Sequence, residues 1–247
     1  MTSPGYKRAP ITEAVIEIRF TNPVTVKKLD KIYKKFSTSY LHHQDVKNIK
    51  VDLRLPGHQT GIPKAEFDQE LGHRLSTTDM TELLVLWPSA FVVSQLAPYP
   101  GWDVFFQRFV RDWKIWKRSM GHPSVARIGV RYINRIDIPI SGPIVEYEKF
   151  INVYPKLPDV LGPVNAYGVQ AVLPIVDIGC KLTLNSAIVA SPILDYASFV
   201  VDQDISKEVD APQSDNAIYE LLSEIRKRKN IIFEACITDS ARELFQR

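Results

Sequence analysis

Apolar and polar residues alternate near the start of the chain, over residues 12–20. Read as extended backbone, one side of this segment carries Ala14, Ile16, Ile18 and Phe20. A period of two residues is typical of a β-strand that buries one face. Asn22 and Pro23 follow, and we expect the strand to end there.

Two segments instead repeat their apolar residues every three or four positions. Residues 24–41 do so with Leu29, Ile32, Phe36 and Tyr40, and residues 102–120 with Phe105, Phe106, Phe109, Trp113 and Trp116. This spacing places apolar side chains along one face of an α-helix. We predict an amphipathic helix in each segment, and we interpret the aromatic stripe of the second as part of the core.

The remaining periodic runs predict further strands and helices. Strands are expected at residues 49–55, 71–78, 81–87, 90–96, 125–138, 167–176, 179–189 and 193–205. Helices are expected at residues 145–153 and 214–245, the second with a bend near Lys229 and Asn230. Short separators such as Pro88-Ser89 suit hairpin turns, which join antiparallel strands. The predicted fold class is therefore α+β with antiparallel sheet.

Each half of the chain follows the same order of strand, helix, several strands and helix. We therefore predict two tandem β-α-β-β-β-α-like units, covering residues 1–121 and 122–247, with antiparallel sheets and packed helices. The two units are expected to form one globular body, with a seam near Gly121. The alternative is that two similar orders arose by chance, since the halves share no clear residue-level identity.

Composition places the chain among ordinary globular proteins, with 45% hydrophobic and 24% charged residues. No apolar stretch approaches the roughly 20 residues that span a bilayer. The first ten residues lack the apolar core of a signal peptide, so we expect a cytoplasmic protein with no membrane association. Cys180 and Cys236 lie in separate apolar runs and are predicted to be buried thiols.

Three stretches of sequence together form a recognisable pattern. They are Pro-Ile-Thr-Glu-Ala at residues 10–14, Arg-Ile-Gly-Val-Arg-Tyr-Ile-Asn at residues 127–134, and Phe-Glu-Ala-Cys-Ile-Thr at residues 233–238. Over essentially its full length the chain resembles a sporadically distributed, uncharacterised family of prokaryotic proteins. That family has no assigned activity, so the resemblance implies no catalytic residue. A patchy distribution is common among genes of mobile or defence-related loci, which implies a biological setting and not a mechanism.

Three arginines are predicted to line one face of the strand at residues 125–138. Period-two alternation places Arg127, Arg131 and Arg135 together, opposite an aliphatic face, and Gly129 leaves a gap between two of them. Such a row suits an anion site, because planar guanidinium groups bind phosphates and carboxylates by paired hydrogen bonds. The favoured alternative is an internal ion-pair network. Its candidate partners are Glu13, Glu17, Glu234 and Asp239.

Basic residues concentrate on the predicted helices, although the formal net charge is only +3. If these helix faces lie side by side, they form a surface for polyanions such as nucleic acid or an acidic protein. The candidate nucleic-acid contacts are Lys27, Lys31, Lys34, Arg108, Arg111, Lys114 and Arg118, and the last helix adds Arg226, Lys227, Arg228 and Lys229. Solvated helix faces are the alternative, and no motif for sequence-specific reading of nucleic acid is present.

No catalytic motif is present, since the chain lacks a Walker loop, a GxSxG elbow and a GxGxxG turn. The histidines His42, His43, His58, His73 and His122 are expected in loops or near strand ends, without a metal-type spacing. We therefore predict no catalytic residue, no metal and no cofactor. A metal-assisted hydrolase would require histidines and carboxylates to converge in one pocket.

These observations favour a non-enzymatic binding or regulatory protein that acts through protein contacts. The resemblance adds the expectation of a mobile or defence-related prokaryotic locus. The alternative hypothesis is binding of an anionic ligand or nucleic acid through the arginine row and the basic helices. The sequence leaves the identity of the partner and the oligomeric state open.

Overall fold

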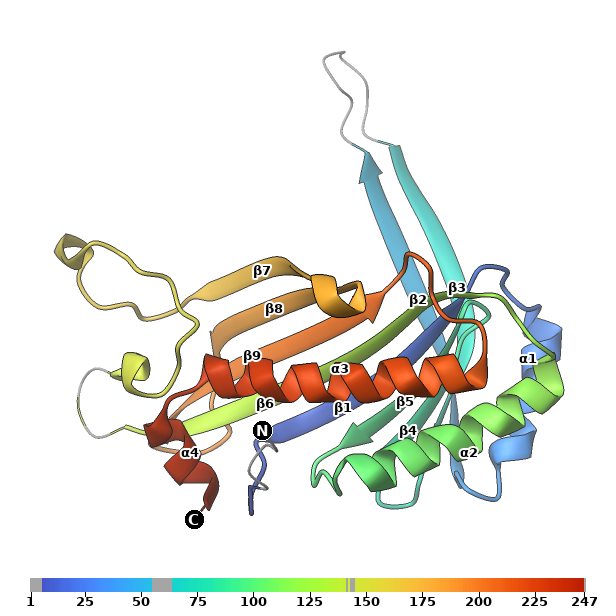
Figure 1. Cartoon of the computed structure of the whole chain (residues 1–247), viewed down its shortest axis with the longest axis horizontal. Coiled ribbons are helices and arrows are strands. Elements are labelled where there is room, and N and C mark those ends of the chain that lie inside the picture. Colours follow the sequence, from blue (N-terminus) through green and yellow to red (C-terminus); the bar gives the residue numbers. More distant parts are fainter. Residues whose placement is uncertain (1–5, 55–63, 141, 143–144, 247) are drawn as a thin grey trace.

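One antiparallel sheet forms the framework of the protein (Figure 1). The structure is a computed structural model that describes residues 6–54, 64–140, 142 and 145–246. Within them, the strands are β1 (Ile11–Phe20), β2 (His42–Arg54), β3 (Lys64–Ser76), β4 (Glu82–Leu86), β5 (Ala90–Leu96), β6 (Val125–Pro139), β7 (Gly168–Ile175), β8 (Cys180–Val189) and β9 (Tyr196–Lys207). The helices are α1 (Val26–Ile32), α2 (Trp102–Met120), α3 (Asp215–Cys236) and α4 (Asp239–Gln246), with 3-10 turns η1 (Tyr33–Phe36), η2 (Tyr147–Lys149), η3 (Asp159–Leu161) and η4 (Val176–Ile178).

The sheet extends outward in both directions from the pairing of β1 with β6. On one side of this pair follow β5, β4, β3 and β2, and on the other side follow β9, β8 and β7. The two long helices, α2 and α3, lie across the same face of the sheet (Figure 1). The hairpin of β2 and β3 projects beyond the other strands.

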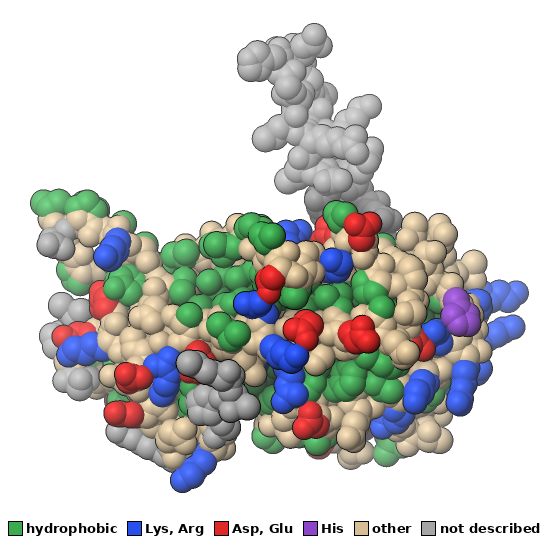
Figure 2. All heavy atoms as spheres, viewed as in Figure 1, with side chains coloured by type: hydrophobic (Ala, Val, Ile, Leu, Met, Phe, Trp, Pro, Cys, Tyr) green, Lys and Arg blue, Asp and Glu red, His purple; other side chains and the backbone are tan. Residues whose placement is uncertain are grey.

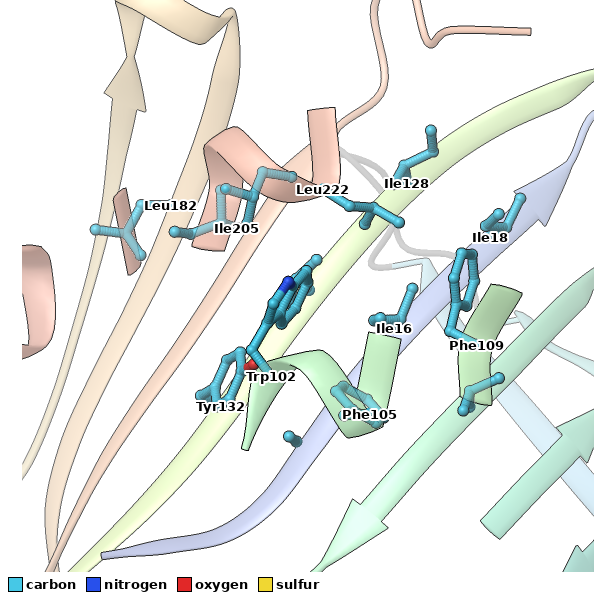
Figure 3. Packing of buried hydrophobic residues seen from close by; sticks show 14 of the residues in the cluster. Ile16, Ile18, Trp102, Phe105, Phe109, Ile128, Tyr132, Leu182, Ile205 and Leu222 are labelled. Atoms are coloured by element: carbon cyan, nitrogen blue, oxygen red, sulfur yellow. The ribbon is translucent and has the colours of Figure 1, made fainter. Parts of the chain in front are cut away.

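The face of the sheet beneath the helices is apolar. Ile16 and Ile18 of β1 and Ile128 and Val130 of β6 are fully buried, as the alternation predicts. The stripe of α2 packs into the same core with Phe105, Phe109, Trp113 and Trp116. Figure 3 shows side chains from α2, α3 and the central strands meeting there. This packing sets where the two helices sit relative to each other.

The α+β class and the antiparallel sheet are confirmed, but some predicted boundaries are wrong. The predicted helix at residues 24–41 is the short α1 followed by η1. The predicted helix at residues 214–245 is divided into α3 and α4, and the break is not at Lys229. It occurs at Ile237, which leaves the helix to form a β-bridge with Ile151. No described helix has both the length and the apolar character needed to cross a membrane.

Three histidines, His42, His43 and His73, lie in paired strands and close to strand ends, as expected. His43 belongs to β2 and His73 to β3, because the hairpin pairing starts at His42 and continues through polar sequence. Regular cross-strand hydrogen bonding, and not apolar alternation, defines these strands. His58 lies outside the described residues.

The two halves of the chain share one sheet and one core, since β1 pairs with β6 across the predicted seam. The first half has one strand more than the predicted β-α-β-β-β-α order. In the described part of the second half, 3-10 turns and no α-helix separate β6 from β7. The predicted boundary after residue 121 falls in the loop between α2 and β6. That the two halves arose as a tandem repeat stays a prediction.

Arg108, a predicted nucleic-acid contact, is buried and only 6% exposed. Its guanidinium group donates hydrogen bonds to the carbonyl oxygens of Leu83 and Ser94 and to the hydroxyl of Tyr40. That hydroxyl donates in turn to Asp112, which is fully buried. The cluster connects α2 with β4, β5 and the segment after η1. Arg108 therefore stabilises the fold and does not belong to a binding surface.

Replacing Arg108 by alanine should lower the free energy of unfolding by about 3 kcal/mol, because buried carbonyl oxygens lose their donor and a cavity forms. Urea denaturation of the variant and the wild type measures the difference. The control is Lys114→Ala on the exposed side of the same helix, which should change stability by less than about 0.5 kcal/mol. An equal loss of unfolding free energy in the two variants would contradict the conclusion that the hydrogen bonds of Arg108 stabilise the fold.

Candidate functional site

A cavity of about 380 Å³ lies where the start of α2 meets the C-terminal half of α3. Its walls come from the segment before β1, the loop between β5 and α2, strand β6 and helix α3. We call it the central pocket. The residues that give it chemical character are Tyr99, Trp102, Tyr132, Arg226, Lys229 and Glu234.

The loop before α2 places the first turn of that helix at the wall of the central pocket. Gly101 precedes the helix with a φ of 98°, a conformation that favours glycine. Trp102 then begins the helix and lines the pocket. Unpaired N–H groups give the start of a helix a partial positive charge. This end of the pocket therefore favours negative charge.

Lys229 brings an amine to the central pocket and forms no ion pair with the carboxylates of the described residues, although the charge of Glu234 at the same pocket partly offsets its own. Its Nζ lies 3.9 Å from the centre of the Tyr132 ring. Burial, and to a smaller extent the neighbouring Arg226 charge, lowers the pKa of Lys229 to about 8. The guanidinium group of Arg226 lies over the ring of Trp102, also at the pocket. Two neighbouring cations thus lie at the pocket together with the carboxylate of Glu234, and Arg226 also forms an ion pair with Asp103 (3.5 Å).

Other polar groups of the central pocket are already engaged. Glu234 accepts hydrogen bonds from the Tyr6 hydroxyl (2.6 Å) and from Nε of Arg242 (2.8 Å). The hydroxyls of Tyr99 and Tyr132 lie 2.9 Å apart. Burial raises the pKa of both tyrosines, that of Tyr99 to about 12, so both are neutral at physiological pH. One of the two hydroxyls donates to the other, so the pair can offer one neutral hydrogen-bond donor beside a cationic amine.

The spacing of Lys229 in the sequence predicts that it differs from the other basic residues of its helix, but the basic residues beside it make this pattern easy to miss. Lys229 is partly exposed, and it lies at helical spacing from the buried residues of α3, which are Ile218, Leu222, Ile225, Phe233 and Cys236. Grouping it with the basic faces of the helices is therefore wrong. A lysine at helical spacing among apolar residues indicates a buried amine.

The arginines of β6 share one face of an extended strand, as predicted. Each is paired with carboxylates of the same chain: Arg127 with Glu17 (2.5 Å) and Asp204 (2.8 Å), Arg131 with Asp202 (2.8 Å), and Arg135 with Asp137 (3.0 Å). A Cβ at Gly129 would lie 2.3 Å from Nη1 of Arg127, so the guanidinium group occupies the predicted gap. This geometry favours the internal ion-pair network. A role of the row as an anion site stays a prediction.

Lysine and arginine side chains gather at the end of the molecule formed by α1 and α2 (Figure 2). The turn η1, which directly follows α1, meets α2 there, where Lys35 donates a hydrogen bond to Ser119 (3.0 Å). Five predicted nucleic-acid contacts are exposed in this region, which we call the basic patch: Lys27, Lys31, Lys34, Lys114 and Arg118. Arg111 is also exposed but is paired with Asp112 (2.8 Å).

The basic residues of α3 do not join the basic patch. Arg226 and Lys229 lie near Trp102 at the start of α2, whereas the basic patch meets that helix near Ser119. These two positions of α2 are separated by about 25 Å, at 1.5 Å per residue. The prediction of side-by-side basic faces thus holds for α1 and α2 and not for α3.

Both cysteines are free and buried, which confirms the prediction of buried thiols. Burial raises the pKa of each thiol, that of Cys236 to about 11. A thiol with a raised pKa is a poor nucleophile at neutral pH. Neither cysteine is therefore a candidate for covalent catalysis.

The fold and the central pocket together define an α+β protein with a cavity of ligand size. No protein-family model matches the chain, and no curated protein matches it. The resemblance to a prokaryotic family therefore stays a prediction.

Replacing Lys229 by methionine should raise the free energy of unfolding at pH 7 by about 2 kcal/mol, since methionine fills similar space without a buried charge. Below pH 8 the amine is protonated in both the folded and the unfolded chain, so its full cost is present. As the pH rises from 8 toward 10.5, the folded chain releases this proton first and the wild type gains stability. The advantage of the variant should therefore shrink over this range.

Denaturant titrations of both proteins from pH 7 to pH 10 measure this effect. The matched control is Lys227→Met, which removes an exposed lysine two positions away. It should change stability by less than about 0.5 kcal/mol at every pH. A destabilised Lys229→Met protein would show that the lysine serves the fold and would contradict this interpretation.

Proposed function

We propose that the protein is a non-enzymatic binding protein that takes a small organic anion into the central pocket. The observation that supports this most strongly is the Lys229 amine, which lies at the pocket with a pKa lowered to about 8 and without an ion pair to the described carboxylates. A buried cation costs folding free energy unless an anion compensates it. A bound phosphate or carboxylate supplies that compensation.

The walls of the pocket support a ligand with an apolar body and one charged end. A volume of about 380 Å³ suits a small metabolite. Tyr99, Trp102 and Phe233 provide aromatic surface. Lys229, Arg226 and the start of α2 provide positive charge. Nucleoside monophosphates and aromatic carboxylates belong to this class of ligand.

Calorimetric titration with the four common nucleoside monophosphates and with benzoate and phenylacetate tests the proposal. At least one probe should bind at pH 7 and should bind about tenfold more weakly at pH 9, because Lys229 then carries its proton in about one molecule in ten. Lysine labelled with 13C at Cε should report, by NMR, a higher pKa for Lys229 in the complex than in the free protein.

Lys229→Met should abolish this binding, and Lys227→Met should leave it unchanged. Binding that is equal in wild type and Lys229→Met would contradict the proposal. So would the absence of binding by every probe at millimolar concentration.

We also propose that the protein acts as a regulator by binding a partner protein. The resemblance implies that it does so in a mobile or defence-related prokaryotic locus. Apolar side chains exposed at β7, η4 and α3 support a surface for protein contacts: Leu173 (44%), Val176 (83%) and Ile231 (56%). Figure 2 shows apolar side chains gathered over β7 and β8. Co-purification from native cells that returned no partner would remove this part of the proposal.

Binding of nucleic acid is the second candidate function, and the basic patch supports it. Exposed lysines of α1 and η1 lie beside Lys114 and Arg118 of α2. No ion pair joins these side chains to the carboxylates of the described residues. Such a surface binds the phosphate backbone with an affinity that falls steeply as salt rises.

Fluorescence anisotropy with single- and double-stranded oligonucleotides at low salt tests this second function. The triple variant Lys31→Glu, Lys34→Glu and Arg118→Glu should weaken binding at least about tenfold, because three phosphate contacts become repulsive. Lys227→Glu, a single charge reversal away from the basic patch, is the control. Absence of binding by the wild type would exclude this function.

A further inference from the structure

Two histidines and an aspartate converge where the β2–β3 hairpin meets α1 and η1. Nε2 of His43 lies 3.0 Å from Nδ1 of His73. Oδ1 of Asp45 lies 3.0 Å from the same nitrogen of His73 and 3.3 Å from Nε2 of His43. Three potential metal ligands thus form a nearly equilateral triangle.

The register of the hairpin produces this convergence. His43 and Asp45 are two residues apart on β2, so their side chains emerge on the same face. His73 of β3 is paired directly with Asp45 across the hairpin. The three side chains therefore meet although 30 residues separate the two histidines in the chain.

We propose that His43, Asp45 and His73 bind a divalent transition-metal ion, with zinc as the first candidate. Zinc bonds to histidine nitrogen and carboxylate oxygen are about 2.0–2.2 Å long, which places tetrahedral ligands about 3.3 Å from one another. The observed separations of 3.0, 3.0 and 3.3 Å match this spacing. Two imidazole ligands favour a transition metal over magnesium or calcium, which prefer oxygen.

Asp30 of α1 supports the proposed metal site from outside. Its Oδ1 lies 3.0 Å from Nε2 of His73. A proton on Nε2, held by this carboxylate, leaves the lone pair of Nδ1 free to face the metal. Tyr33 stacks on the ring of His43, with centroids 4.2 Å apart and planes 9° apart, and lies 4.3 Å from the ring of His73. Both imidazole rings are therefore held in the orientation that binding needs.

Hydrogen bonds can also link the three atoms in pairs, because either imidazole nitrogen can carry a proton toward Asp45 or toward the other ring. A metal ion satisfies the lone pairs of all three atoms at once.

The site is open on one side. The His73 side chain is 8% exposed, whereas the side chains of His43 and Asp45 are 32% and 82% exposed. Three protein ligands with an accessible fourth position resemble zinc sites that bind water and not closed structural sites. The proposed ion therefore completes its coordination with water or with a small anion from solution.

Titration of untagged, chelator-stripped protein with Zn²⁺ against a chromophoric chelator tests the proposal, and the visible spectrum with Co²⁺ reports the coordination geometry. The wild type should bind one equivalent. His43→Ala and Asp45→Ala should weaken binding more than about 100-fold, and Asp30→Asn, which alters only the outer partner, about 10- to 100-fold. Circular dichroism of the metal-free variants checks that each is folded.

His42→Ala is the matched control, because this neighbouring histidine projects from the opposite face of β2. It should leave the affinity for Zn²⁺ unchanged. The proposal is overturned if the wild type binds Zn²⁺ no more tightly than His43→Ala, or if His42→Ala loses as much affinity as His43→Ala.

Discussion

The antiparallel pairing of β1 with β6 is the contact on which the rest of the structure depends. It joins the two halves of the chain into one sheet and places the apolar sides of both strands beneath α2 and α3. Because side chains alternate along a strand, the same pairing turns Glu17 and the β6 arginines to the opposite face, where they form ion pairs. One backbone register thus sets both the hydrophobic core and the ionic face.

The fold places basic side chains in three environments with different consequences. The β6 arginines are matched by carboxylates, and Arg108 donates its hydrogen bonds to buried acceptors, so both support stability. The lysines of the basic patch remain in water, where a charge costs little. Lys229 differs from both groups, because its amine is buried without an ion pair to the described carboxylates. A buried charge without an ion pair is unfavourable for folding, and its presence in a ligand-sized cavity is the physical basis of the proposed function.

The central pocket and the proposed metal site arise from different parts of the architecture. The pocket lies at the junction of the two halves, because α2 begins where α3 and β6 pass it. The metal site lies toward the β2 edge of the sheet, where the hairpin register and the short α1–η1 segment bring four polar side chains together. Neither site uses the arginine row, so a ligand at either site would leave the β6 ion pairs in place.

The sequence by itself determined the class of the fold, most of the strands and helices, and the side of β6 that the arginines occupy. These features depend on local periodicity, which reports the apolar face of each element. Sheet order and register decided the rest: which acids pair with Arg127, that Arg108 is buried, that Lys229 faces a cavity, and that His43 meets His73. Distances between elements depend on how their faces pack, and no local pattern along the chain encodes those distances.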